Sequence, residues 1–204
     1  MNTSWKKAQE WEHDWWSDCT NTLNEEIKQQ TYAKYMGLNR VTVESGYPYD
    51  IAGKSIIDIG GGPVSLLLKT INRGKCAVVD PCDYPEWTME RYRVANIEYI
   101  KMQGEDIDKL DLTFDSAFIY NVLQHTENPE LIIKKALEKS KELRIFEWVD
   151  AKTNIGHPHT LTEEKLNKWI GKPGIVITLN GENNCFGKAY YGIFKSKTFK
   201  ENRI

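Results

Sequence analysis

The chain has 204 residues, enough for one domain with a large buried core. Its 27 basic and 29 acidic side chains give a formal net charge of -2, so there is no basic field that would attract nucleic acid. No apolar run is long enough to span a membrane, and the N-terminus lacks the apolar core of a signal peptide. The four cysteines have no CxxC spacing, which favours reduced thiols. These features predict a cytoplasmic globular protein with neither a membrane nor a nucleic-acid partner.

The first 50 residues are predicted to form a helical cap that is rich in tryptophan. One helix face would be built from residues at near-helical spacing: Trp5, Ala8, Trp11, Trp15 and Cys19. Thr22 and Glu25 are spaced as a capping box for a second helix, which would run to about Met36 and end at Gly37. The tryptophans would either pack residues 1–50 against the remaining chain or form a lid over a ligand.

From Gly53 onward, strands and helices alternate. A strand at 55–59 ends in three glycines, and a helix is expected from Val64 to about Ile71, aiming free N–H groups at a ligand. The remaining elements are predicted in this order: a strand at 76–79, a helix with Pro85 at its first position, a strand at 97–102, a short helix after 104–106, a strand at 114–120, a helix begun by Asn128 and Pro129, a strand at 144–149, a helix with Thr160 and Glu163 as capping box that ends at Gly171, and strands at 175–179 and 189–194.

This alternation predicts an α/β fold for residues 51–204, with a Rossmann-like sheet of seven mostly parallel strands and helices on both faces. The turn Asn180-Gly181 lies between the last two strands, which are expected to form a hairpin. Because a hairpin pairs its strands antiparallel, one of the two C-terminal strands must run against the others.

Candidate site residues follow from the rule that ligands of such a sheet bind beyond the carboxyl ends of its strands. Glycines at 60–62 would let a ligand approach the backbone closely, and Asp80 would accept hydrogen bonds from a ribose diol. The rule selects these residues: Asp58, 60–65, Asp80, Glu105, Asp106, Tyr120, Asn121, Gln124, His125, Glu147, Trp148, Asp150, His157 and His159.

Four strings occur in an order that resembles class I S-adenosylmethionine-dependent methyltransferases, in particular the group acting on small molecules: IIDIGGGP, VVDP, QGEDI and FDSAFIYNVLQHTENPE. The resemblance covers about residues 50–195, and HTLTEEKLNKWIG is similar to the helix that precedes the last two strands in this family. The chain departs from the family in two places. Val64, after Pro63, stands where a third glycine is usual, and 139–142 reads KSKE where a Gly-Gly turn is common.

The resemblance implies S-adenosylmethionine as the cofactor. Gly60, Gly61 and Gly62 would contact its methionine portion, and Asp58 would support that loop or the amino group. Asp80 would bind the ribose hydroxyls, and Glu105 or Asp106 would bind the adenine amino group. Pro81 and Asn121 are counted with the cofactor-binding residues, although Asn121 would equally serve to close its strand or contact a substrate.

Catalysis of methyl transfer from a sulfonium requires an aligned nucleophile and, for a hydroxyl or amine, a base. His125, His157, His159 and Tyr120 are the catalytic candidates, with a histidine as general base. Each also has a structural alternative: a turn residue, a surface loop or a strand end. Three histidines with Glu147 would also suit a metal, but no tight ligand spacing such as HxxxH is present, and none is predicted.

Two other functions remain open at this stage. Gly60-x-Gly62 followed by Asp80 also fits a nicotinamide-dependent oxidoreductase, and a non-catalytic cofactor-binding protein could dock a partner through its tryptophans. Methylation of nucleic-acid bases is disfavoured, because 120–123 reads YNVL where such enzymes resemble one another in an Asn/Asp-Pro-Pro-Tyr/Phe segment. A small polar substrate is expected, while the acceptor atom and the oligomeric state stay open.

Overall fold

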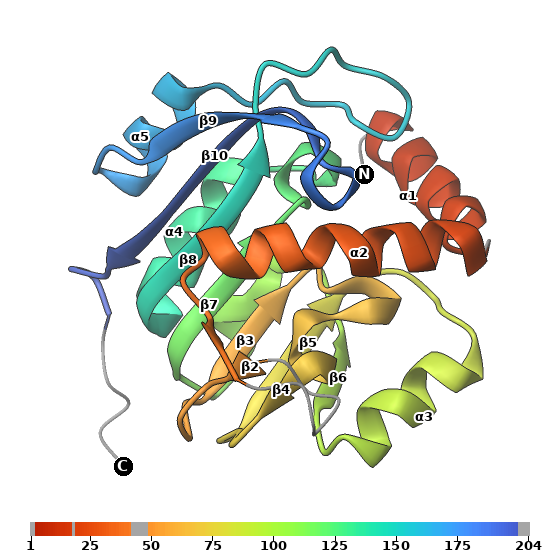
Figure 1. The fold of residues 1–204 in the computed structure, drawn as a ribbon, viewed down its shortest axis with the longest axis vertical. Coiled ribbons are helices and arrows are strands. Elements are labelled where there is room, and N and C mark those ends of the chain that lie inside the picture. The colour runs from red at the N-terminus through yellow and green to blue at the C-terminus, as the bar shows by residue number, and fades with distance from the viewer. Residues whose placement is uncertain (1–2, 18, 42–48, 200–204) are drawn as a thin grey trace.

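A seven-stranded sheet with the order β6-β5-β3-β7-β8-β10-β9 is the centre of the computed structural model, which describes residues 3–17, 19–41 and 49–199. Its strands are β3 (Ile56–Ile59), β5 (Cys76–Asp80), β6 (Glu98–Lys101), β7 (Phe114–Tyr120), β8 (Ser140–Trp148), β9 (Ile175–Asn180) and β10 (Phe186–Lys195). The first five in this order pair in parallel, whereas β10 is antiparallel to both β8 and β9 (Figure 1). The predicted seven-stranded, mostly parallel fold with an antiparallel C-terminal strand is therefore confirmed.

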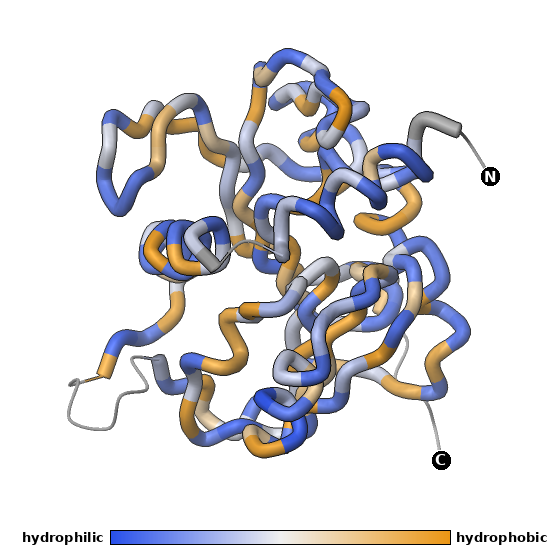
Figure 2. The backbone as a smooth tube through the Cα atoms, turned by 90° about the vertical axis from the view of Figure 1, so that its right-hand side faces the viewer, coloured by the Kyte–Doolittle hydropathy of each residue, from blue (hydrophilic) through white to orange (hydrophobic). Residues whose placement is uncertain are grey.

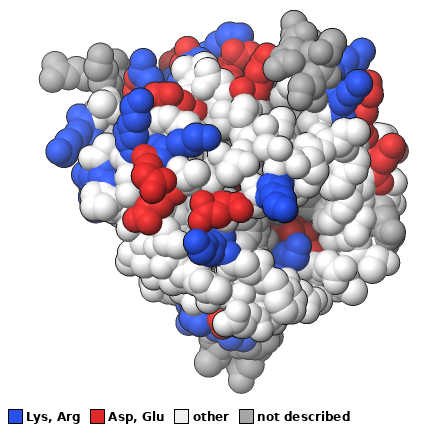
Figure 3. Space-filling model, turned by 90° about the horizontal axis from the view of Figure 1, so that it is seen from above, with Lys and Arg blue, Asp and Glu red and all other residues white. Residues whose placement is uncertain are grey.

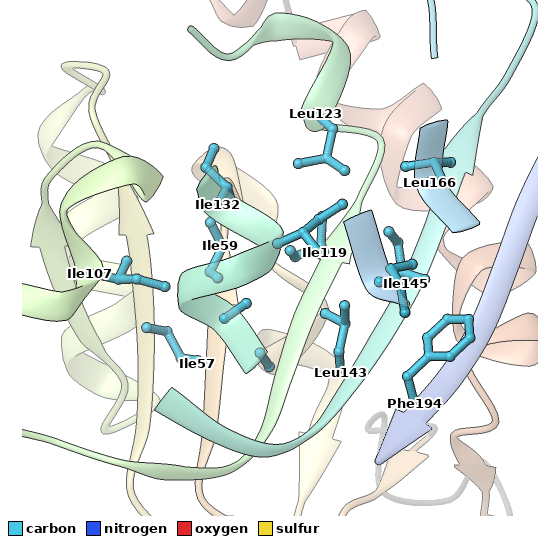
Figure 4. Close-up of a cluster of buried hydrophobic side chains, with 14 of the residues drawn as sticks. Ile57, Ile59, Ile107, Ile119, Leu123, Ile132, Leu143, Ile145, Leu166 and Phe194 are labelled. Atoms are coloured by element: carbon cyan, nitrogen blue, oxygen red, sulfur yellow. The ribbon is translucent and has the colours of Figure 1, made fainter. Parts of the chain in front are cut away.

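One face of the sheet is covered by α4 (Pro129–Lys139), α5 (Glu163–Ile170) and the 3-10 segment η4 (Gly104–Lys109). Successive residues of a strand point to opposite faces, so Ile57 and Ile59 of β3 enter this core while Ile56 enters the other. Figure 4 shows the resulting cluster, in which Ile132 of α4 and Leu166 of α5 lie against the strands. Asn128 begins α4 as predicted, because its side chain accepts a hydrogen bond from the Leu131 amide.

The other face is covered by α2 (Cys19–Tyr35), α3 (Glu86–Val94) and η3 (Leu66–Lys69). Tyr32 and Ala33 of α2 share a buried core with Ile56, Phe118 and Phe146 of the sheet. Figure 2 shows α2 end-on, with apolar and polar residues around its axis, as expected for a helix with one buried face. Helix α2 is therefore part of the layer that covers this face of the sheet.

The helix α1 (Thr3–Trp16) contacts α2 and the 3-10 turn η5 (Leu123–His125) at the carboxyl ends of the strands. Gly156 packs so closely on Trp11 that a Cβ there would lie 2.5 Å from Trp11 Cε3. The division into a cap of residues 1–50 and a domain of 51–204 remains a proposal. Because α2 packs in the core of the sheet, only α1 could form a separate cap. Within the described ranges, no helix combines the length and apolar character needed to cross a membrane.

Both predicted capping boxes are wrong. Helix α2 begins at Cys19, before Thr22, and the Glu25 side chain turns instead to Asn121 Nδ2, which donates to it at 3.2 Å. Thr162 rather than Thr160 caps α5, and its hydroxyl accepts from the Lys165 amide at 3.3 Å. Tertiary partners and local backbone geometry decide which of several capping residues is used.

The N- and C-terminal boundaries of other helices are closer to the prediction. Gly37 and Gly171 follow α2 and α5 with φ of 68° and 76°, in the left-handed region that ends helices. Pro85 is the residue before α3 instead of its first residue.

The α-helix predicted for 64–71 is also wrong. Two 3-10 turns, η2 (Gly62–Val64) and η3, are separated by Ser65, whose backbone is extended (φ -45°, ψ 143°). The chain then forms β4 (Thr70–Ile71), which joins β1 (Asn39–Arg40) and β2 (Tyr49–Asp50) in a small sheet. Arg73 donates to the carbonyl groups of Leu67 and Ala95, which ties this segment to the end of α3.

We expect Gly60→Ala to destabilise the protein more than Gly53→Ala, although both glycines have φ of 74°. A Cβ at Gly60 would lie 2.0 Å from Val122 Cγ2, whereas one at Gly53 meets nothing within 4 Å. The left-handed backbone should cost about 1 kcal/mol in each variant, and overpacking should add about 1–3 kcal/mol at Gly60 alone. Urea unfolding measures both losses, and equal losses would contradict the close approach of the Gly60 loop to Val122.

Candidate active site

A cavity of about 460 Å³ lies at the carboxyl ends of the strands, between the loops that follow them and α1. This volume lies in the range of small-molecule sites, about 300–1,000 Å³. Its lining includes these predicted site residues: Gly60, Gly62, Asp80, Pro81, Glu105, Asn121, His125 and His157. Of the residues assigned to the cofactor or to catalysis, five are not in the lining: Asp58, Gly61, Asp106, Tyr120 and His159.

Asp80, at the end of β5, ties its own loop to the glycine loop after β3. Its carboxylate accepts hydrogen bonds from the Gly62 amide at 3.1 Å, the Cys82 amide at 3.0 Å and the Tyr84 hydroxyl at 3.0 Å. Burial raises the pKa of Asp80 to about 6, although these three donors oppose the shift. An ionised carboxylate has about four acceptor positions, so one position remains for a ligand in the cavity.

Asp58 and Tyr120 form a buried support beneath the glycine loop. The hydroxyl groups of Tyr120 and Ser65 each donate to Asp58 Oδ2 at 2.5 Å, and Tyr120 in turn accepts from the Leu66 amide at 2.9 Å. Burial raises the pKa of Asp58 to about 7 despite the two hydroxyl donors. Because its hydroxyl group is bonded within this network and does not line the cavity, Tyr120 is not retained as a catalytic residue.

The backbone amides that were expected to face a ligand donate hydrogen bonds to other groups of the protein instead. The Ser65 amide donates to the hydroxyl of Tyr92 at 3.1 Å, and that hydroxyl donates to the Gly62 carbonyl at 2.6 Å. With the Gly62 and Leu66 amides bonded to Asp80 and Tyr120, the loop is a rigid wall of the cavity instead of an open helix N-terminus.

Glu105 and Asp106 are separated by the structure. Glu105 lines the cavity, and its Oε1 accepts from the amides of Glu127 and Asn128 at 3.1 and 2.8 Å, which fixes the loop before α4. Asp106 forms an ion pair with Lys109 at 2.9 Å, outside the lining. Of the two acidic residues expected near the adenine, only Glu105 lines the cavity.

Asn121 connects the end of β7 to α2. Its backbone has φ of 53°, its Nδ2 donates to Glu25 at 3.2 Å, and its Oδ1 accepts from Gln124 Nε2 at 3.1 Å. The side chain lines the cavity with both of its polar atoms already bonded, so its role is to shape the wall.

His125, in η5, is buried beside a carboxylate from α1. Its Nδ1 lies 2.8 Å from Glu12 Oε1 and 2.7 Å from the Gly156 carbonyl oxygen. Both neighbours accept hydrogen bonds, so Nδ1 carries the hydrogen and Nε2 is the free base nitrogen of the neutral ring. Nε2 lies 3.4 Å from the Gln124 amide nitrogen, which is a donor.

Electrostatics strengthen the Glu12–His125 pair. Burial by itself would lower the pKa of His125, but the charge and hydrogen bond of Glu12 and the Gly156 carbonyl raise it above its ordinary value overall. Burial would likewise raise the pKa of Glu12, yet His125 and the Trp16 hydrogen bond lower it overall. The raised pKa of His125 and the lowered pKa of Glu12 have the same cause, which is the attraction between the two groups.

His157 lies next to this pair, with its ring centre 4.5 Å from that of His125. Its Nδ1 is 3.0 Å from Asn154 Nδ2, and burial together with the neighbouring His125 lowers the pKa of His157 to about 4. His157 is therefore neutral at pH 7. His159 contacts the Gln124 carbonyl through its backbone amide at 3.4 Å and does not line the cavity.

Glu12 is the residue that sequence reasoning missed. It lies within the tryptophan-rich face of α1, and all four tryptophans of this helix line the cavity: Trp5, Trp11, Trp15 and Trp16. Of the three carboxylates of this helix, Glu10, Glu12 and Asp14, Glu12 has the helical spacing of the tryptophan face, four residues before Trp16, and this was the available signal. Its partner His125 follows β7 far along the chain, and only the fold brings the two together.

Glu147 of β8 holds the turn that carries His125. Its Oε1 accepts from the amides of Val122 and Leu123, both at 3.1 Å, while Oε2 has no partner within the part of the chain that the structure describes. Burial raises the pKa of Glu147 to about 7, against the opposing effect of these amides. Glu147 does not line the cavity, and the described residues contain no group of three or more potential metal ligands.

We expect Glu147→Gln to reduce the loss of stability as pH rises from about 4 to 7. In this pH range the Glu147 carboxyl keeps its proton in the native state, whereas a glutamate of the unfolded chain, with a pKa of about 4.3, has released it. The free energy of unfolding therefore falls by up to about 1.4 kcal/mol per pH unit. Urea unfolding from pH 5 to 8 measures the slope, with Glu98→Gln, on exposed Glu98, as control. Parallel curves for wild type and Glu147→Gln would contradict the protonated state of Glu147.

No protein-family model matches the sequence, and comparison with curated proteins finds no match. Solved structures do match. An O-methyltransferase family protein from Burkholderia thailandensis has a TM-score of 0.58 and 13% identity, over 89% of this chain and 62% of that protein. The chain thus spans less than two thirds of that protein's length.

Two further matches were solved with the cofactor or its product. Magnesium protoporphyrin IX methyltransferase from Synechocystis PCC 6803, with bound S-adenosylmethionine, has a TM-score of 0.59 and 14% identity over 88% of this chain and 85% of its own. The N-methyltransferase NodS from Bradyrhizobium japonicum, with S-adenosyl-L-homocysteine, has a TM-score of 0.57 and 12% identity over 84% and 88%. The chain therefore has the fold of the S-adenosylmethionine-dependent methyltransferases, as its motifs predicted.

Proposed function

We propose that this protein is an S-adenosylmethionine-dependent methyltransferase that acts on a small polar molecule. The observation that carries the proposal is the position of the cavity. It opens at the carboxyl ends of β3 and β5, where Gly60, Gly62 and Asp80 meet, in a chain whose fold matches that of solved methyltransferases. Fold alone does not determine function. The groups that line this cavity support the methyltransferase function.

The charge of the lining suits this cofactor, which carries a sulfonium, an ammonium and a carboxylate group and is therefore a net cation. Four acidic residues are in the described lining: Glu12, Glu25, Asp80 and Glu105. Lys28 is the one Lys or Arg among the described lining residues, and it pairs with Glu25 at 3.6 Å. Seen from above in Figure 3, acidic and basic side chains are intermixed over the visible surface. The acidic excess is therefore a property of the cavity lining.

Each part of the cofactor has a proposed partner. The loop of Gly60, Gly61 and Gly62 would contact the methionine portion, and Asp58 would act from beneath it as a support. The free acceptor position of Asp80, beside Pro81, would bind the ribose hydroxyls. Glu105 would bind the adenine amino group through its second carboxylate oxygen, and Asn121 would shape the adjoining wall.

When bound, the cofactor supplies a methyl group that the sulfonium makes strongly electrophilic. The chain must hold a nucleophile in line with the S–CH₃ bond and exclude water, and such positioning can lower a barrier by about 7–11 kcal/mol. His125 Nε2 is proposed as the general base, an effect typically of about 10²–10⁴-fold. The neutral His157 beside it is proposed to contact the substrate.

Strand order weighs against a nicotinamide-dependent oxidoreductase. The common dinucleotide-binding sheet has the order 3-2-1-4-5-6 with parallel strands. Here β10 is inserted antiparallel between β8 and β9. A non-catalytic binding protein would not need the paired base His125 in its cavity.

We expect Asp80→Ala to weaken S-adenosylmethionine binding by more than about tenfold, because it removes a charge-assisted contact to the ribose and the anchor of the glycine loop. Isothermal titration calorimetry with S-adenosylmethionine and S-adenosyl-L-homocysteine measures the effect. Asp83→Ala is the matched control, since Asp83 lies in the same loop with a 77% exposed side chain. Unchanged affinity in a folded Asp80→Ala protein would contradict the ribose assignment.

A further inference from the structure

We propose that Glu12 of α1 is a positioning residue that orients His125 as the general base, and that the acceptor is a hydroxyl group on a small aromatic molecule. This inference rests on the proposed methyltransferase function and extends it in two respects. It makes α1 a part of the active site, and it names the chemical class of the substrate.

The two oxygens of the Glu12 carboxylate have separate partners. Oε1 lies 2.8 Å from His125 Nδ1, and Oε2 accepts from Trp16 Nε1 at 2.9 Å. The side chains of Glu12 and His125 are each 13% exposed, so solvent competes little for either group. The indole of Trp16 fixes the carboxylate, and the carboxylate fixes the imidazole.

This arrangement determines the tautomer of His125. With the hydrogen on Nδ1, between Glu12 and the Gly156 carbonyl, Nε2 carries the lone pair, which accepts a long hydrogen bond of 3.4 Å from the Gln124 amide that a substrate hydroxyl would replace. A carboxylate behind a histidine also stabilises the imidazolium that forms when Nε2 accepts a proton. The other ionisable groups that act on this ring are His157, at 4.5 Å between ring centres, and Glu147 of β8.

The α1 side of the cavity is lined mostly by flat aromatic rings. Trp11 and Trp15 lie nearly parallel, at an interplanar angle of 26° with centres 6.2 Å apart. The aromatic residues of the lining on this side and at its rim are Trp5, Trp11, Trp15, Trp16, Trp148 and Phe186. Such walls favour a planar aromatic ligand, because stacked and edge-on ring pairs add to the gain from apolar burial.

The charges of the cavity lining and of the sulfonium favour one type of reacting group on that ligand. The acidic lining repels a carboxylate, and Lys28 is already paired with Glu25. An ammonium group would be repelled by the sulfonium beside which it must react. A hydroxyl on an aromatic ring, with a pKa of about 10 as in tyrosine, stays neutral at pH 7 and needs a base to react.

The hydroxyl proton moves to His125 Nε2, an oxygen lone pair forms the new O–CH₃ bond, and the S–CH₃ bond breaks with its electron pair staying on sulfur. The products are an aryl methyl ether, S-adenosyl-L-homocysteine and an imidazolium paired with Glu12. The proton then leaves to solvent as the products are released.

The pairing is tested by NMR titration of the histidine rings in wild type, Glu12→Gln and Glu10→Gln. Glu10 is exposed on the same helix and serves as the matched control. Loss of the Glu12 charge should lower the pKa of His125 by about one unit or more, and Glu10→Gln should leave it unchanged. An equal pKa of His125 in all three proteins would overturn the positioning role of Glu12.

The acceptor is tested by transfer of labelled methyl from S-adenosylmethionine to catechol, benzoate and benzylamine. We expect label on the catechol oxygen only. His125→Ala should reduce kcat by about 10²–10⁴-fold, and Glu12→Gln should reduce kcat by about tenfold or more and move the acidic limb of the pH profile to lower pH, because the base is active only when deprotonated. Neither variant should greatly change KM for S-adenosylmethionine.

Label on benzoate or benzylamine, or on none of the three, would overturn the aromatic hydroxyl assignment. Calorimetry on the same preparations separates this failure from a failure of the proposed function. Wild-type protein that binds S-adenosylmethionine but methylates none of the three remains a cofactor-binding protein with another acceptor. Folded protein that shows no binding contradicts the methyltransferase function itself.

Discussion

Two buried carboxylates hold the loop on which the site depends. Asp58 lies beneath the loop and binds it through Ser65 and Tyr120, while Asp80 binds the Gly62 amide from the neighbouring strand. Among the residues that the structure describes, no lysine or arginine pairs with either carboxylate, and burial raises the pKa of both. Their hydrogen bonds to hydroxyl and amide groups offset part of the desolvation cost. The cavity floor is thus shaped before any ligand binds, which reduces the ordering cost of binding.

The other wall of the cavity comes from α1, and its packing differs from that of α2. Helix α2 buries Tyr32 and Ala33 in the core of the sheet, so it contributes to the stability of the fold. Helix α1 instead places tryptophan rings and Glu12 against the cavity and the turn at His125. Because α1 borders the cavity with Glu12 and its tryptophans, its position is suited to respond to what occupies that cavity, which is the physical content of the lid hypothesis.

Much of the site was open to prediction because its residues follow strands. The parallel order places the ends of β3, β5 and β7 side by side, so Gly60, Asp80 and His125 had to meet at one edge. The predictions that were wrong concerned groups that form hydrogen bonds between distant segments. Tyr120 and the amides of the loop were expected to face the ligand, but Asp58, Tyr92 and Asp80 bind them. Glu105 and Asp106 are adjacent in sequence, and only Glu105 reaches the cavity.

The sequence by itself determined the fold class, the antiparallel closing strand and the strand-end residues, because periodicity and turn residues act over a few positions. Tertiary structure alone decided three other points. It replaced the helix after the glycine loop with two 3-10 turns, selected Thr162 over Thr160 as a cap, and placed Glu12 against His125. The 3-10 turns and the Glu12–His125 contact depend on residues far apart in the chain, and local propensity is too weak to override such contacts, whereas the choice of Thr162 depends on the backbone geometry at the start of α5.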